Sequence, residues 1–160
     1  MKPELGLSEK SRGAVVGILN VLLADEYVLY TETRNYHWNV VGLQFSPLHK
    51  FFEAQYEELN EIVDEVAERA RTLGGWSSGT LTGFLKGARL KERPGDHPDD
   101  RGMLSNLLSD HEAVIRTLRV DADDCAEKYR DLGTNDFLIG LMERHEKMTW
   151  MLRAHLEGGR

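Results

Sequence analysis

The sequence predicts an all-α protein: a bundle of four long helices, with a short extra helix in the connection between the second and the third. Apolar residues recur at three- and four-residue intervals over four segments of the 160-residue chain. Glycine, proline or capping residues separate these segments, and none of them alternates as a strand does. The length suits one domain with a substantial core. We expect that domain to span 1–160, with short flexible tails at 1–7 and 157–160.

The first two helices are predicted from capping signals and apolar periodicity. The first is expected to run from Ser8, as N-cap, to near Tyr36. The second is expected to begin with Ser46 as N-cap and Pro47 at the first helical position, and to end at Leu73 before a Gly-Gly pair.

The second half of the chain predicts a crossover and two more long helices. A short helix is expected around residues 81–85, followed by the polar loop KERPGDHPDD. A third long helix is expected from about Arg101, and a fourth from Thr134 or Asp136. The connection of about 25 residues favours a crossover over four successive hairpins. The fourth helix is expected to turn these residues inward: Phe137, Leu138, Leu141, Met142, His145, Met148, Met151, Leu152 and His155.

Composition narrows the classes of function. The net charge is -7 and the pI is near 5.4, so the chain has no general attraction for nucleic acid. A single cysteine, Cys125, allows no intrachain disulfide and suits a reducing cytoplasm. The N-terminal residues lack the apolar region of a signal peptide, and the longest apolar stretch is short for a membrane span. We expect a cytoplasmic protein with no membrane partner.

Four residues are candidate ligands for one metal centre. Asp64 and Glu68 are spaced i, i+4 in the second helix, so both carboxylates emerge on one face. His37 ends the first helix, and His49 lies near the start of the second. His49 precedes Asp64 by 15 residues, which is roughly 22 Å along a helix. If all four residues bind one iron centre, a second copy of the chain must supply half of them.

An ordinary structural explanation competes with the metal centre. Asp and Glu at i, i+4 usually form a solvated helix face, and the neighbouring Glu57, Glu61 and Glu65 fit that pattern. A histidine at a helix end is more often a cap or a partner of the helix dipole than a ligand. The residues alone leave both interpretations open.

The segment YHWNVVGLQFSPLHKFFEAQYEELNEIVDEVAERARTLGG closely resembles the signature of the Dps family, the mini-ferritins named as DNA-binding proteins from starved cells. The spacing of 12, 15 and 4 residues between the four candidate ligands is the spacing of that family. A second match, Asp131, Thr134 and Asp136, resembles the family's D-x-x-T-x-D turn before the last helix.

The resemblance implies a hollow dodecamer of ferritin-like four-helix-bundle subunits, with ferroxidase sites at its two-fold interfaces. It implies that His37 and His49 come from one subunit, and Asp64 and Glu68 from the other. The substrate would be Fe(II), oxidised to Fe(III) by hydrogen peroxide in preference to oxygen and stored as a mineral. Such a protein would protect against oxidative stress.

The resemblance also assigns secondary roles. Glu53 matches an auxiliary carboxylate for a second, weaker iron, and Trp38 matches an aromatic residue beside the site. Asp131 and Asp136 match acidic residues that line the iron-entry pores. The alternatives are that Trp38 simply packs in an interface and that Asp136 simply favours a helix N-terminus.

Three other functions compete with a shared iron centre. A di-iron centre within one subunit needs Glu-x-x-His pairs, and none of the six histidines has Glu three residues before it. A bundle with vestigial sites would not need all four ligands. The remaining alternative is a nucleoid protein that compacts DNA and binds iron secondarily. The N-terminal lysines Lys2 and Lys10 are offset by Glu4 and Glu9, so we expect little DNA binding.

Four further residues are expected to serve the structure and to take no part in chemistry. We expect core or interface positions for His111, His145 and His155, and a buried, inert thiol for Cys125.

Overall fold

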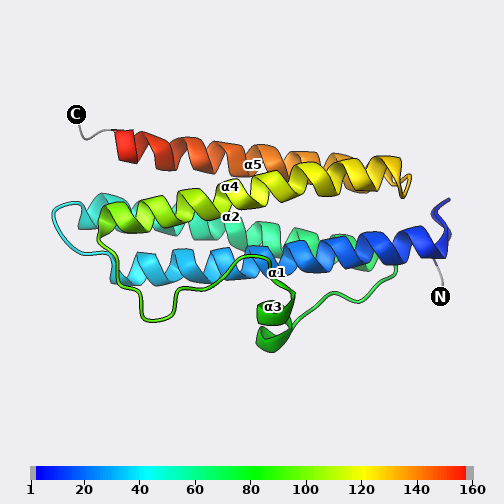
Figure 1. Cartoon of the computed structure of the whole chain (residues 1–160), viewed down its shortest axis with the longest axis horizontal. Helices are drawn as coiled ribbons and strands as arrows, with labels where there is room; N and C mark the ends of the chain where they lie inside the picture. The colour runs from blue at the N-terminus through cyan, green and yellow to red at the C-terminus, as the bar shows by residue number, and fades with distance from the viewer. Residues whose placement is uncertain (1–2, 158–160) are drawn as a thin grey trace.

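The computed structural model describes residues 3–157 and contains five helices in that range. They are α1 (Glu9–Asn39), α2 (Phe45–Thr72), α3 (Leu81–Gly87), α4 (Asp100–Glu127) and α5 (Leu132–Glu157). Four of them are long and form a bundle, and the short α3 lies outside α1 (Figure 1). The predicted all-α bundle with an extra helix in the central connection is confirmed. The parts of the expected flexible tails at 1–2 and 158–160 lie outside the described residues.

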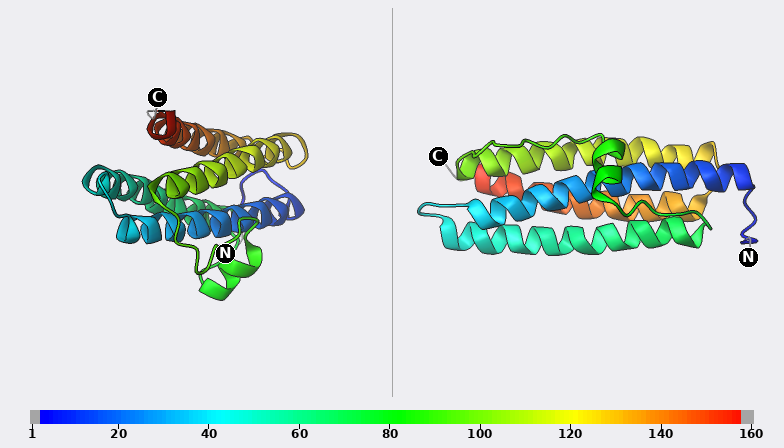
Figure 2. Two further views of the ribbon diagram at one scale, coloured as in Figure 1. Left: turned by 60° about the vertical axis from the view of Figure 1, so that its left-hand side comes forward. Right: turned by 90° about the horizontal axis from the view of Figure 1, so that it is seen from below.

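The bundle consists of two antiparallel pairs, α1 with α2 and α4 with α5, joined by the crossover that contains α3. The α1–α2 loop and the α4–α5 turn lie at opposite ends of the bundle in both side views (Figures 1 and 2). The end of α1 and the start of α2 are therefore at one end, and the end of α2 lies near the start of α5 at the other. This arrangement separates the histidines of the candidate centre from its acids.

Three predicted helix boundaries need correction. The N-cap of α2 is Gln44, which makes no side-chain capping bond, so Ser46 and Pro47 lie inside the first turn. A proline is tolerated there because the first backbone N–H groups of a helix have no intrahelical partner. The last helix begins at Leu132, before Thr134 and Asp136, and α1 continues past Tyr36 to Asn39.

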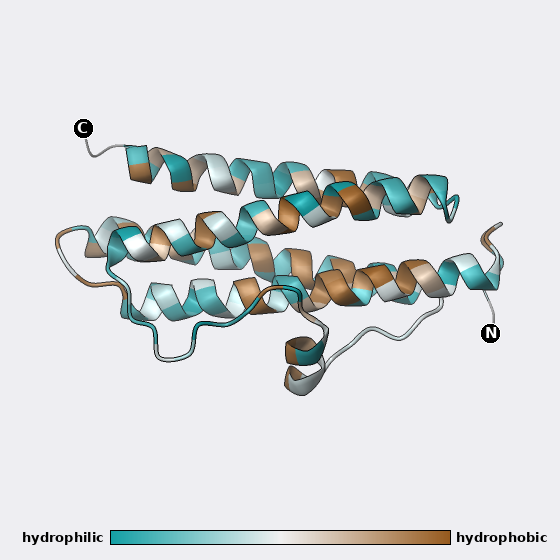
Figure 3. Cartoon of the chain, viewed as in Figure 1, coloured by the Kyte–Doolittle hydropathy of each residue, from teal (hydrophilic) through white to brown (hydrophobic). Residues whose placement is uncertain are grey.

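The core runs along the inside of all four long helices. Figure 3 shows the most hydrophobic stretch along the middle of α1. Side chains with no exposed surface include Leu19, Leu22, Phe52, Leu59, Ile62, Leu107, Leu118, Leu138 and Leu152. Two expectations for α5 were wrong: Met151 is 37% exposed and His155 is exposed, so this side of the C-terminal half of α5 faces outward in the single chain. Cys125 is fully buried, as expected.

Within residues 3–157, α1 alone is long and apolar enough to cross a membrane by length and composition. Half of its most apolar window is buried in the structure. A core helix of a helical bundle passes the same test of length and composition.

Partly buried ion pairs tie the crossover to the bundle. The carboxylate of Asp25, in α1, accepts hydrogen bonds from the backbone N–H groups of Arg89 and Leu90 and from the Arg89 side chain. Further along, Arg93 donates to Glu32 of α1 and to Asp110 of α4. These contacts give a segment with little helix a defined path over α1.

Candidate metal centre

The structure brings His37 and His49 together by a reciprocal pair of hydrogen bonds. The Nδ1 atom of His37 lies 2.7 Å from the backbone oxygen of His49, and Nδ1 of His49 lies 2.8 Å from the backbone oxygen of His37. The rings stack, with centroids 3.8 Å apart and planes 21° apart. The last turn of α1 and the first turn of α2 are thereby held side by side.

These bonds determine which ring nitrogen remains available. A carbonyl oxygen only accepts, so each Nδ1 must carry the hydrogen. In a neutral imidazole the lone pair then resides on Nε2, which is the form that binds a metal. Neither Nε2 makes a hydrogen bond within residues 3–157. The two histidines thus present two oriented donor atoms at one end of the bundle.

Asp64 and Glu68 lie far from that end, on the exposed surface of α2. In the part of the chain that the structure describes, neither carboxylate has a hydrogen bond or ion pair. Their neighbours Glu58, Glu61 and Glu65 differ, because all three pair with Arg144 of α5.

The acids of α2 therefore divide between two faces, one that contacts Arg144 of α5 and one with no partner among residues 3–157. His49, Glu53, Glu57, Asp64 and Glu68 fall within an arc of about 100° on the second face. Glu53, the proposed auxiliary carboxylate, is half-buried one turn after His49.

The candidate ligands do not form a metal centre within the described part of one chain. Among residues 3–157, no three histidine, cysteine, aspartate or glutamate side chains converge as a metal site. Because α2 is one continuous helix from Phe45 to Thr72, the spacing of His49 and Asp64 along it is fixed at roughly 22 Å. The histidines are oriented by their hydrogen bonds and the two acids are exposed, but the histidines and the acids lie at different places along α2.

Aromatic side chains and one arginine surround the histidine pair. Tyr56 meets the His37 ring edge-on with centroids 5.2 Å apart. The Arg34 guanidinium lies 5.0 Å from the ring centroids of both Tyr56 and Trp38. Trp38 is 63% exposed, so its indole is available to a neighbouring molecule. Sequence reasoning gave Trp38 a role but gave none to Arg34 or Tyr56. Arg34 lies four residues before Trp38 in α1, a spacing that places their side chains on one face, and Tyr56 lies two turns after His49 in α2.

The two aspartates of the D-x-x-T-x-D turn have different surroundings. Asp131 is 3% exposed, and its carboxylate accepts from the backbone N–H and the hydroxyl of Thr134 at 2.9 and 2.6 Å. It also pairs with Arg69 of α2 at 3.4 Å. Asp136 is exposed. The structure thus gives Asp131 the position of a helix cap and leaves Asp136 at the surface.

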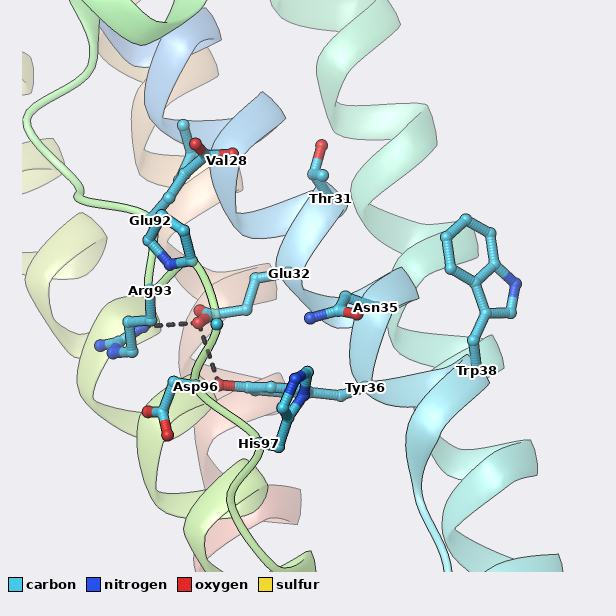
Figure 4. Close-up of a pocket in the computed structure, with 12 residues that line it drawn as sticks. Val28, Thr31, Glu32, Asn35, Tyr36, Trp38, Glu92, Arg93, Asp96 and His97 are labelled. Carbon is cyan, nitrogen blue, oxygen red and sulfur yellow. Dashed lines mark hydrogen bonds and ion pairs between the residues drawn. The ribbon is translucent and has the colours of Figure 1, made fainter.

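A cavity of about 380 Å³ lies between α1 and the crossover, apart from the four candidate ligands (Figure 4). Glu32, Tyr36, Arg93 and His97 line it, and Glu32 bonds to both Arg93 and Tyr36. Burial, together with the nearby Asp110, raises the pKa of Glu32 to about 7 despite the arginine. The cluster fastens the crossover to the bundle, and its charge depends on pH.

Comparison with known proteins assigns the chain to a known fold family. The family model for the ferritin-like domain matches residues 16–160. A low temperature-induced protein of Nostoc sp., described as uncharacterised, is 50% identical over 96% of this chain and 86% of its own length. The DNA protection during starvation protein 2 of Bacillus anthracis is 35% identical over 89% of this chain and 96% of its own. The Dps crystal structure from Vibrio cholerae is 34% identical, covers 98% of both chains and superposes with a TM-score of 0.89.

Proposed function

The chain belongs to the Dps family of ferritin-like proteins, and from this premise we propose that it is a ferroxidase that oxidises Fe(II) and stores the ferric product in a hollow dodecamer. Membership relates the chain to iron storage and DNA protection in general. We propose in addition which residues bind the iron, that hydrogen peroxide is the oxidant and that twelve subunits assemble. The observation that carries it is the reciprocal His37–His49 bonding, which leaves two Nε2 lone pairs with no hydrogen-bond partner among residues 3–157.

The iron site is proposed to lie between two subunits related by a two-fold axis. His49, Asp64 and Glu68 share one face of α2, so two such helices crossing antiparallel bring the histidine end of one to the acidic end of the other. His37 and His49 of one chain would then face Asp64 and Glu68 of its mate. The same contact repeats on the other side of the axis, giving two equivalent sites for each dimer.

The ligand set suits the reaction. Neutral imidazole and carboxylate together bind Fe(II), and anionic oxygen stabilises the higher charge of Fe(III). Each of two Fe(II) ions gives up one electron, and one hydrogen peroxide accepts both, takes up two protons and leaves as two waters. Holding two irons near one oxidant favours this two-electron path over the one-electron path that releases hydroxyl radical.

Other residues take supporting roles in the proposal. Glu53 would assist the second iron, because it lies one turn from His49 on the same face of α2. Trp38 would contact the mate beside the site. Asp136 would line the entry pore and attract cations, whereas Asp131 would act through the shape of the turn. We place the protein in the cytoplasm, in agreement with its single buried thiol.

An iron-oxidation assay tests the function. Apoprotein is mixed with Fe(II) and limiting hydrogen peroxide, and ferric absorbance is followed in the near ultraviolet. We expect His37→Ala and Asp64→Asn to lose fast oxidation while keeping the mass of the assembly. Asp123→Asn is the matched control, because it changes an exposed helical aspartate of α4 that is outside the candidate ligand set. Fast oxidation in the His37 and Asp64 variants would refute the assignment.

A further inference from the structure

Three ionisable side chains form a continuous hydrogen-bonded line through the centre of the bundle. Oε1 of Glu26, in α1, is hydrogen-bonded to Nε2 of His145, in α5, at 2.9 Å. The other ring nitrogen of His145 lies 2.9 Å from Nδ1 of His111, in α4. All three residues have no exposed surface. The line thus connects three of the four long helices, and it involves none of the residues of the proposed iron site.

The charged residues next to Glu26 and His111 in sequence pair with arginines. Asp25, beside Glu26, pairs with Arg89; Asp110 and Glu112, on either side of His111, pair with Arg93 and Arg153. The end atoms of the line, Oε2 of Glu26 and Nε2 of His111, are buried and have no hydrogen-bond partner. The charged residues beside His145 in α5 turn away from it: Arg144 pairs with glutamates of α2, and Glu146 pairs with Arg119 of α4.

The remaining elements add no charge to the line. The buried polar side chain that α2 contributes to the bundle is the uncharged Gln55, and α3 lies outside α1 (Figure 1). No ion pair within residues 3–157 therefore compensates a further charge on the line.

The number of protons on the three side chains decides whether both hydrogen bonds of the line can form. Each of the two hydrogen bonds needs one hydrogen between its atoms. If Glu26 is ionised and one imidazole is charged, both bonds form and the line is neutral overall. If both imidazoles are charged, an N–H of His111 faces an N–H of His145 across 2.9 Å, and that bond is lost. A second buried positive charge would then also lack a counter-ion.

We propose that Glu26, His145 and His111 act as an acid-sensitive lock, which joins α1, α5 and α4 while at most one imidazole is charged and loosens the bundle when both are. The lock is independent of the iron chemistry. It makes the folding of each subunit depend on pH through one proton that the folded core excludes.

The sign of the effect follows from His111. Burial, and secondarily His145, lowers the pKa of His111 well below the ordinary 6.5. An unfolded chain takes up a proton at His111 as the pH falls below about 6.5, and the folded chain does not. The lock's contribution is therefore complete above that pH and is lost below it. One excluded proton lowers the folding equilibrium constant by up to about tenfold for each pH unit.

Urea unfolding of the whole assembly, at one fixed protein concentration and between about pH 7.5 and 5, tests this. His111→Asn keeps a polar group near the Nδ1 position but does not titrate. We expect the ratio of the wild-type to the His111→Asn folding constant to fall about tenfold per pH unit below about 6.5. Titration of Glu32 cancels in this ratio. His97→Asn, which removes an exposed histidine, should follow the wild type. A constant ratio for His111→Asn would refute the lock.

A second measurement needs no variant, in case His111→Asn does not fold. Exchange of the imidazole C2 hydrogen for deuterium, read by mass spectrometry of the wild-type assembly, gives the titration of each histidine. We expect His111 to stay neutral to a pH well below the ordinary histidine pKa of 6.5. Titration of His111 near that ordinary value would overturn the proposal.

Discussion

Asp131→Ala is predicted to destabilise the fold, because the carboxylate of Asp131 caps α5 and joins it to α2. The substitution removes two bonds to Thr134 and a partly exposed pair with Arg69. Loss of a helix N-cap costs about 1 kcal/mol. Leaving the buried Thr134 hydroxyl without its acceptor costs about 1–2 kcal/mol. The arginine pair adds less than about 1 kcal/mol because Arg69 is partly solvated.

Together these terms predict a loss of about 2–4 kcal/mol in the free energy of unfolding. For a chain of this size that lowers Tm by roughly 5–15 °C. The assay is thermal and urea unfolding followed by circular dichroism at one protein concentration, since assembly itself stabilises the subunit. Asp136→Ala is the matched control. Asp136 is exposed, so its loss should change the free energy of unfolding by less than about 1 kcal/mol while slowing iron entry.

Comparing the two variants distinguishes a structural role of each aspartate from a role in an iron-entry pore. If Asp131→Ala unfolds like the wild type and slows iron uptake, the carboxylate faces a pore and the capping argument is wrong. If Asp136→Ala takes up iron at the wild-type rate, Asp136 is merely a favourable residue at a helix N-terminus.

Three further predictions concern other parts of the molecule. Glu32 binds its proton more tightly in the folded chain, where its pKa is about 7, than in the unfolded chain, where the ordinary value is 4.5. As the pH rises from about 4.5 to about 7, the free energy of unfolding of the wild type should therefore fall by about 1 kcal/mol relative to that of Glu32→Gln. Equal slopes for wild type and Glu32→Gln in urea would contradict this. Burial raises the pKa of the Cys125 thiol to about 12, so a thiol reagent at neutral pH should modify the denatured chain and spare the native one; rapid labelling of the native protein would show that the site opens. The net charge of -7 predicts little retention of DNA in a gel-shift assay at physiological salt, whereas tight, salt-resistant binding would favour the nucleoid alternative.

The fold could be predicted from sequence because each long helix repeats its apolar residues at helical spacing. Boundaries were less predictable, because capping depends on conformation as well as residue type. Ser46 has the chemistry of an N-cap, yet the helix begins one residue before it with Gln44 in the capping position. In the last helix, Asp131 rather than Thr134 accepts the capping bonds, so the helix starts earlier than either expected residue.

The candidate site was predictable in its residue types but not in its local geometry. Spacing alone shows that His49 and Asp64 lie too far apart on one helix to share an ion. The reciprocal carbonyl bonds of His37 and His49 depend on the packing of two helices, which periodicity does not specify. Glu26 follows a long apolar run, a position that suggests a buried carboxylate. Its partners His111 and His145 could not be predicted, because they are more than 80 residues away in the chain.

Met151 and His155 show a different limit of the same reasoning. Both occupy apolar-face positions in α5, yet both are exposed in the single chain. Periodicity identifies an apolar face without saying whether the same chain or another molecule covers it.

The most direct test of the shared iron site is complementation between two inactive variants, His49→Ala and Asp64→Asn, co-expressed in equal amounts. In a mixed dimer, one of the two sites combines intact histidines from one chain with intact acids from the other. Random pairing should therefore restore about a quarter of the wild-type oxidation rate, although each variant alone is inactive. A mixture as inactive as its parents, in assemblies shown by mass to contain both chains, would contradict a site built from two subunits.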